Sequence, residues 1–370
     1  MTVCTEVPKV LGNIPSLVGP DPAELKFFLD SSTPVIVRNA MADCSIAAID
    51  TEAAAVAALG DITIQIQQNY TSPLTRGGGR HDGHSVLSQK VRNEIREMRL
   101  ADYCAHVHAD PDTDLLCVEY HTPAPVLDLM RIPECCSPSD SLEPLVSFLF
   151  LANRGNYAHL HFDGDYRNVL LYQVFGRKRV VMVPLTATEK IAPAMNFSKL
   201  LIQNMSESEK LDLFRYLGAY DCLIAPGDMV YFPPSIWHYV EYVDNGMSVN
   251  FRFGRDDIAR RLVDANRVPF YPQLHQLLDG LGRLGDAERR RLADTMWTRL
   301  AATLGRDYPS ARDRHRSVQD LYRDLLHELP GRELPRQLST DCPIADAMAI
   351  ERYESQSRLW REELMLGVPL

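Results

Sequence analysis

Two histidines and one aspartate have the residue types and the spacing to hold a metal ion. His161 and Asp163 stand in the tripeptide His-Phe-Asp, and His238 ends the run Tyr-Phe-Pro-Pro-Ser-Ile-Trp-His. In a strand, residues i and i+2 point to one face, so His161 and Asp163 are predicted to point together. Two histidines and a carboxylate on one face of a metal leave open positions, which is typical of non-haem Fe(II) oxygen chemistry. The alternative is a set of hydrogen-bonded polar residues in the core.

Short β-rich runs surround these three residues and must position them. Between residues 145 and 253 the runs are SFLFLA, VLLYQVF, RVVMVP, MVYFP and SVNFRF, with Gly-, Pro- and Asp-containing turns between them. Several short strands punctuated by turns indicate an all-β sandwich or barrel. The His-Phe-Asp tripeptide opens one such run, and His238 closes another that begins with the turn Pro-Gly-Asp. The sequence therefore predicts that one β architecture brings the three residues together.

The remainder of the 370 residues divides around this β region. We expect an α/β part over 1–144, the barrel core over 145–254 and a helical region over 255–370. An apolar stripe recurs every four residues in the helical region, at Leu292, Met296, Leu300 and Leu304. Such a stripe is either core or a dimer seam. Residues 71–85 contain three consecutive glycines and are expected to form a loop, which is either a lid or a plain connection.

Composition restricts the class of protein. The chain is 45% hydrophobic and 24% charged, as ordinary globular proteins are, and its net charge is −10. That acidic balance argues against a general nucleic-acid binder. No apolar stretch approaches the roughly 18 residues of a membrane span. The eight cysteines are scattered without a Cys-x-x-Cys pair, and the N-terminus shows no secretion signal, so we expect reduced thiols and a cytoplasmic location.

Two segments carry a family resemblance. HFDGDYRNVLLYQVFGRKRVVMVP and APGDMVYFPPSIWHYVEYVDNGMSVNFRF are similar to the JmjC/cupin-like oxygenases, which include the asparaginyl hydroxylases and the tRNA wybutosine-synthesising hydroxylases. The resemblance covers residues 145–254 and, more loosely, 20–70. It implies a mainly β fold with helical additions, namely a double-stranded β-helix (a cupin/JmjC jelly-roll barrel) with a C-terminal helical region. It also implies a homodimer formed through C-terminal helices.

The resemblance assigns roles to the residues that match the family motif. His161, Asp163 and His238 match the ligands of Fe(II). Lys178, in Gly-Arg-Lys, matches the lysine that binds the distal carboxylate of 2-oxoglutarate. A buried dianion needs a cation, and an ammonium is a compact one. The alternative for Lys178 is a surface lysine in a hairpin, since arginines flank it on both sides.

Other carried-over contacts depend on the alignment. Asn168 and Asn250 match asparagines near the co-substrate, with ordinary strand-end hydrogen bonding as the alternative. Where the family often has Thr-Pro before the first histidine, this chain has Ala158 and His159. The missing hydroxyl is then expected from Tyr157, Tyr172 or another residue. We expect His159 on the same strand face as His161 and Asp163, near the metal.

The activity implied by the resemblance is hydroxylation of a C–H bond with Fe(II), 2-oxoglutarate and O2. The expected substrate is a protein, a peptide or a small amino-acid-like molecule. Neither a membrane nor a nucleic acid is an expected partner. Two alternatives stay open: a tailoring oxygenase of natural-product biosynthesis, and a metal-holding cupin-like protein without oxygenase activity.

Overall fold

A computed structural model describes most of the chain. The described residues are 8–19, 22–68, 95–136, 145–191, 193–194, 196–198, 200–266, 272–309 and 311–329. The predicted loop at 71–85 therefore lies outside the described residues. Every helix in these ranges is too short or too polar to cross a membrane.

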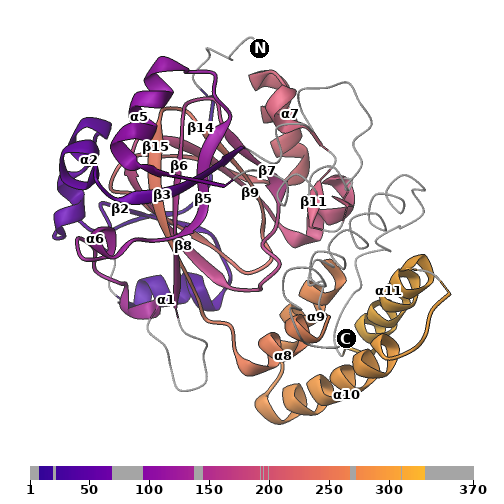
Figure 1. The fold of residues 1–370 in the computed structure, drawn as a ribbon. Helices are drawn as coiled ribbons and strands as arrows, with labels where there is room; N and C mark the ends of the chain where they lie inside the picture. Colours follow the sequence, from indigo (N-terminus) through magenta and orange to yellow (C-terminus); the bar gives the residue numbers. More distant parts are fainter. Residues whose placement is uncertain are drawn as a thin grey trace.

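Eight antiparallel strands form the centre of the molecule, and all of them lie between residues 146 and 253. Four belong to one sheet in the order β13-β8-β15-β6, and four belong to the second sheet in the order β7-β14-β9-β12. Figure 1 shows strands of both sheets packed together at the centre of the molecule. In chain order they are β6 (Val146–Ala152), β7 (Tyr157–His161), β8 (Asn168–Phe175), β9 (Lys178–Val183), β12 (Tyr220–Ile224), β13 (Met229–Phe232), β14 (Trp237–Tyr242) and β15 (Gly246–Phe253). Two four-stranded sheets interleaved in this way form a jelly roll, which confirms the predicted double-stranded β-helix.

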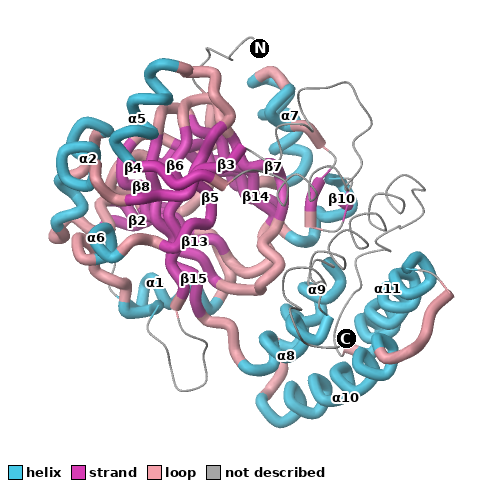
Figure 2. The backbone as a smooth tube through the Cα atoms, in the orientation of Figure 1, coloured by secondary structure: helices cyan, strands magenta, loops and turns pink. Residues whose placement is uncertain are grey.

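The N-terminal part extends the first of these sheets to nine strands. On one side it adds β2 (Val35–Arg38) and β1 (Ser16–Val18), and on the other β5 (Leu115–His121), β3 (Thr63–Gln68) and β4 (Arg96–Arg99). Its helices pack on the outer face of this sheet (Figure 2). These helices are α1 (Pro22–Asp30), α2 (Glu52–Leu59), α5 (Leu100–Ala109) and α6 (Ala124–Leu127), with 3-10 turns at Ser45–Ala48 and Glu134–Cys136.

Strand alternation separates the inside of the barrel from its outside. In β9, Val180 and Met182 belong to the core between the sheets, whereas Val181 and Val183 pack outside. Helix α7 (Glu207–Leu217) covers that outer face. Smaller elements complete this side: 3-10 turns at Leu185–Ile191 and Ile202–Asn204, and the two-residue strands β10 (Pro193–Ala194) and β11 (Phe197–Ser198). The same alternation decides below which polar residues reach the interior.

The C-terminal region is a helical bundle with its own core. It contains α8 (Asp257–Asn266), α9 (Pro272–Leu281), α10 (Asp286–Leu304) and α11 (Ala311–Glu328). Met296 and Leu300 are buried in this core, and Leu292 and Leu304 pack against it. The apolar stripe is therefore core within one chain, and our suggestion of a dimer seam there is wrong, because α8, α9 and α11 already cover the stripe.

Candidate metal centre and co-substrate cavity

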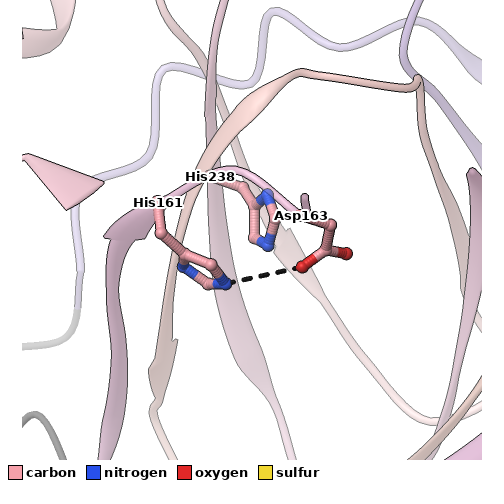
Figure 3. A group of neighbouring side chains, drawn as sticks. All are labelled: His161, Asp163 and His238. Carbon is pink, nitrogen blue, oxygen red and sulfur yellow. Dashed lines mark ion pairs between the residues drawn. The ribbon is translucent and has the colours of Figure 1, made fainter. Parts of the chain in front are cut away.

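His161, Asp163 and His238 come together at one end of the barrel (Figure 3). His161 is the last residue of β7 and pairs directly with His238 on the neighbouring strand β14. Their ring centroids are 4.3 Å apart, and Nε2 of His161 is 3.7 Å from Oδ1 of Asp163. One ligand atom from each residue lies within 4.8 Å of the other two. Ligand atoms about 2.1 Å from one ion lie about 3 Å apart when adjacent, so a small closing movement brings these three to a shared ion.

Backbone carbonyls orient both imidazoles. Nδ1 of His161 is 2.6 Å from the carbonyl oxygen of His159, and Nδ1 of His238 is 3.1 Å from that of Ile236. When each Nδ1–H donates to the carbonyl two residues earlier, the lone pair on Nε2 is left for a metal. Contacts of this kind fix the tautomer and the ring orientation of metal-binding histidines.

The electrostatics of the three residues suit a divalent cation. Burial and the neighbouring His238 lower the pKa of His161 to about 3, so this imidazole is neutral near pH 7. Burial by itself would raise the pKa of Asp163, but Arg252 and the two histidines together hold it below its ordinary value. Neutral imidazole and ionised carboxylate are the forms in which these groups bind metals. The donor set of two nitrogens and one oxygen therefore fits the Fe(II) that the resemblance implies.

A cavity of about 110 Å³ opens beside the three residues. Its walls are mostly apolar or aromatic, including Phe150, Leu171 and Tyr242. The polar residues that line it are Glu119, His161, Asp163, Lys178, His238, Asn250 and Arg252. A mostly apolar cavity with a few convergent polar groups is the usual form of a small-molecule site.

Lys178 is buried inside the barrel, with only 2% of its surface exposed. Its Nζ donates to Oγ of Ser248 at 2.5 Å and lies 4.2 Å from the ring centroid of Tyr242. Burial lowers the pKa of Lys178 to about 7. Within the described part of the chain, no carboxylate forms an ion pair with it. The structure thus excludes the surface-hairpin alternative and presents a buried lysine that has no ion pair with any described carboxylate.

The structure brings one of the two predicted asparagines to the cavity. Asn250 lines it, and its Oδ1 accepts a hydrogen bond from the backbone N–H of Phe148 at 3.1 Å. Asn168 does not line it; its Oδ1 accepts from the hydroxyl of Tyr231 at 2.7 Å. Tyr172 is also directed elsewhere, into the core under the N-terminal helices. Because Val169 and Leu171 face the cavity, alternation along β8 turns Asn168 and Tyr172 to the other face.

His159 is also displaced from its expected place near the metal. The pairing of β7 with β14 passes from His161↔His238 to Ala158↔Val240, so β7 holds one extra residue there. Such a bulge interrupts strict alternation. Ala158 consequently lines the cavity, while Nε2 of His159 contacts the backbone oxygen of Ser198 at 2.6 Å. The prediction that His159 shares a face with His161 was wrong for this reason, although its carbonyl does orient the ring of His161.

The sequence analysis missed Arg252 and Glu119, which line the cavity, and Ser248, which accepts a hydrogen bond from Lys178. Ser248 and Arg252 flank Asn250 on β15, and all three alternate with Met247, Val249 and Phe251, which pack on the outer face. The signal was present in SVNFRF, since the polar residues occupy every second position. Glu119, in contrast, comes from β5, outside the segments that carry the resemblance.

Comparison with known proteins gives a family match and several relatives. The model of the cupin-like domain matches residues 21–257. JmjC domain-containing protein 5 of Drosophila melanogaster is 29% identical over 129 residues, which are 33% of this chain and 31% of that protein. Lysine-specific demethylase 8 of Xenopus tropicalis is 27% identical over 128 residues, 32% of this chain and 28% of that protein. Lysine-specific demethylase JMJ30 of Arabidopsis thaliana is 30% identical over 102 residues, 26% of this chain and 23% of that protein.

These relatives are matched over less than a third of their own length. The family match is broader, because it includes the whole barrel and much of the N-terminal part. It covers well over half of the 370 residues. The chain therefore belongs to the cupin-like domain family.

Proposed function

We propose that this protein uses Fe(II), 2-oxoglutarate and O2 to hydroxylate a C–H bond. One observation supports the proposal: a three-residue group suited to a divalent metal lines the same cavity as a buried lysine that has no ion pair among the described residues. A metal-holding protein without co-substrate has no need of the second feature. Membership of the cupin-like family supports the same conclusion.

Each residue has a distinct task in this proposal. His161, Asp163 and His238 would hold the iron, and Lys178 with Ser248 would hold the distal carboxylate of 2-oxoglutarate. Once bound, the iron and the co-substrate supply the oxidation of an unactivated C–H bond by O2. The apolar walls around Phe150 and Leu171 exclude water from the reaction. We also propose that residues 145–254 are the catalytic core, flanked by 1–144 and 255–370, since the eight barrel strands lie within it.

For the substrate we propose an amino-acid side chain, in a protein, a peptide or a small amino-acid-like molecule. The support comes from relatives that are named lysine-specific demethylases. Oxidation of an N-methyl group also begins as hydroxylation of a C–H bond, so the same cavity chemistry serves both outcomes. A cytoplasmic location and a homodimer remain predictions from the sequence.

The test is formation of succinate by the purified protein with Fe(II), 2-oxoglutarate and O2, alone and with a peptide library. We expect succinate from the wild type, none from His161→Ala, and undiminished formation by His159→Gln. The last variant is a matched control, since its amide can still donate to the oxygen of Ser198. A wild type that binds the metal but forms no succinate under any of these conditions would instead be a metal-holding cupin-like protein.

A further inference from the structure

Arg252 is a buried cation at the metal end of the cavity. Its side chain points inward from β15 and lines the cavity, and only 8% of the residue is exposed. Nη2 donates to Oε1 of Glu119 at 2.9 Å and lies 3.5 Å from Oδ2 of Asp163. Nη1 lies 3.5 Å from Oδ2 of Asp165. One guanidinium therefore lies among three carboxylates, one of which belongs to the candidate metal centre.

The two oxygens of Asp163 have different neighbours. Oδ1 faces Nε2 of His161 at 3.7 Å, and Oδ2 faces Nη2 of Arg252 at 3.5 Å. A planar guanidinium with donors in a fixed fork restrains a carboxylate in a way that a flexible ammonium does not. We propose that Arg252 is a positioning residue that holds Asp163 with Oδ1 turned towards the two histidines. This inference rests on the metal centre of the proposed function.

Glu119 and Phe148 hold the guanidinium in place. The β5–β6 pairing is irregular between Cys117 and Tyr120, and Glu119 has a φ of +51°, a left-handed conformation that favours glycine. Backbone strain of this kind persists where surrounding contacts enforce it. Here it accompanies a carboxylate placed 2.9 Å from Arg252, while the ring of Phe148 lies 5.1 Å from the guanidinium carbon. Contacts from two sides thus restrain Arg252 beside Asp163.

The carboxylates around Arg252 favour positioning over capture of a substrate anion. Glu119, Asp163 and Asp165 all lie within 3.5 Å of its guanidinium. Asp165 also lies near a second cation, since its Oδ2 is 3.8 Å from Nε of Arg167. An anionic substrate group approaching Arg252 would meet these carboxylates, whereas a divalent metal ion would be attracted by them.

The experiment measures binding of the metal alone, with neither 2-oxoglutarate nor O2. Mn(II) affinity and the visible spectrum of the Co(II)-loaded protein are compared in the wild type, Arg252→Met, Arg252→Lys and Arg177→Met. Arg177 is the matched control, because its ion pair with Asp244 at 2.6 Å is half-exposed and outside the cavity. We expect R252M to lose about 10- to 100-fold in Mn(II) affinity, as is typical when a residue that orients a metal ligand is replaced. R252K should retain an intermediate affinity with a partly altered Co(II) spectrum, and R177M should match the wild type.

The outcomes separate this inference from the proposed function. Wild-type affinity and spectrum in R252M would overturn the positioning role while leaving the metal centre intact. Absence of metal binding by the wild type would overturn both. If thermal unfolding shows that R252M does not fold, R252K decides: a severalfold loss supports the fork geometry, and wild-type affinity overturns it.

Discussion

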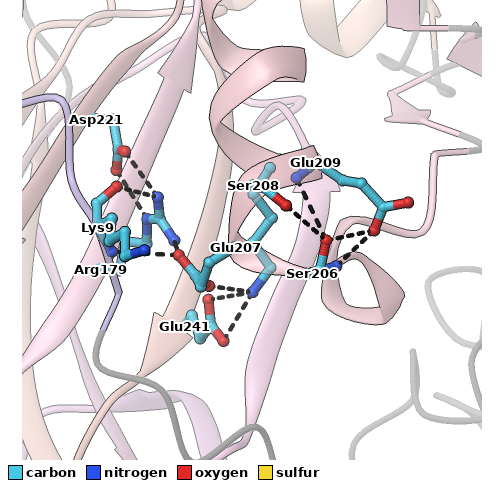
Figure 4. A network of polar contacts seen from close by, with 9 residues as sticks. Lys9, Arg179, Ser206, Glu207, Ser208, Glu209, Asp221 and Glu241 are labelled. Atoms are coloured by element: carbon cyan, nitrogen blue, oxygen red, sulfur yellow. Dashed lines mark hydrogen bonds and ion pairs between the residues drawn. The ribbon is translucent and has the colours of Figure 1, made fainter.

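The two faces of strand β9 each carry a buried basic side chain, and the two side chains differ in their ion-pair partners. Lys178 points into the barrel, where it contacts Ser248 and Tyr242 and has no ion-pair partner in the described part of the chain. Arg179 points out beneath α7 and is fully buried between Asp221 and Glu207, with N–O distances of 2.8 and 2.6 Å (Figure 4). Both residues are inaccessible to bulk water. The fold supplies carboxylates to the outer cation, whereas we propose that a bound co-substrate supplies the carboxylate for the inner one.

In the ion-pair network outside the barrel, each buried basic side chain contacts carboxylates. Lys210 joins it through Glu207 at 3.2 Å and Glu241 at 2.9 Å, and Arg179 also donates to the backbone oxygen of Lys9. Every charge in this group therefore has an opposite charge nearby. Such pairs are costly to break, because removal of one member leaves the others buried and unpaired. We therefore propose that Lys178, which has no ion pair among the described residues, marks a ligand site in this barrel.

The largest effect is expected from Arg179→Met. This change leaves Asp221 and Glu207 without their guanidinium and should lower the free energy of unfolding by about 3–5 kcal/mol, measured by urea denaturation. Arg177→Met is the control, because Arg177 pairs with Asp244 on a half-exposed surface. That pair is worth at most about 1 kcal/mol. Equal losses in the two variants would contradict the contrast between compensated and surface cations.

Lys178→Met should have the opposite effect on the ligand-free protein. It removes an unbalanced buried charge, so the free energy of unfolding should rise by about 3 kcal/mol near pH 6. Affinity for 2-oxoglutarate, measured by calorimetry on Mn(II)-loaded protein, should fall about 10- to 100-fold, since a hydrogen bond between charged groups is lost. Mn(II) affinity should be unchanged. A destabilised variant with normal co-substrate affinity would show that Lys178 is a structural residue.

The lowered pKa of Lys178 predicts a pH dependence of stability and of 2-oxoglutarate binding. Its pKa is lowered by burial from 10.5 to about 7. Between these values the unfolded chain keeps a proton that the native chain has released, so this residue makes stability rise with pH over that window. A bound carboxylate favours the charged lysine, so 2-oxoglutarate binding above pH 7 should take up a proton. We expect calorimetry in buffers of different ionisation enthalpy to show uptake near zero at about pH 6 and approaching one at about pH 8.5, with none in K178M.

The smallest effect is expected at the contact between the barrel and the C-terminal bundle. Ser235 has a φ of +66°, and its Oγ is 2.6 Å from Nδ1 of the buried His275 in α9. The His275 ring lies 4.6 Å from that of Phe162, the residue between His161 and Asp163. Ser235→Ala should cost about 1–2 kcal/mol in unfolding free energy. The exposed Ser208→Ala is the control, and equal small losses would dismiss this contact as a stabilising link.

Much of the barrel and of the candidate metal centre could be predicted from local pattern. The short β runs gave the strands, and the spacing within His-Phe-Asp placed His161 and Asp163 together, as the structure has them. Lys178 follows a tight turn at Gly176, whose φ is +70°, and alternation from there directs it inward. The strands and the shared face of His161 and Asp163 depend on a few neighbouring residues, so local pattern revealed them, whereas the role expected of Lys178 came from the family resemblance.

The other predicted contacts with the cavity depended on which face of a strand each side chain occupies, and a shift by one position changes that face. The side chains of Asn168 and Tyr172 point to the face of β8 that lies outside the barrel. Which face lies outside is determined by how the neighbouring strands pair with β8, and not by the residues of β8 alone. His159 is displaced by a bulge that no turn residue announces. The stripe with Met296 and Leu300 fits a core or a dimer seam equally well, until the helices that cover it are placed.

The most direct test of the central claim is an anaerobic titration of the Fe(II)-loaded protein with 2-oxoglutarate, followed by visible spectroscopy. We expect a weak metal-to-ligand charge-transfer band in the wild type and in R177M, which disappears when O2 is admitted and succinate is formed. In K178M the band should require about 10- to 100-fold more 2-oxoglutarate. Iron binding without any band, or a band that saturates identically in wild type and K178M, would contradict the assignment of the buried lysine to the co-substrate.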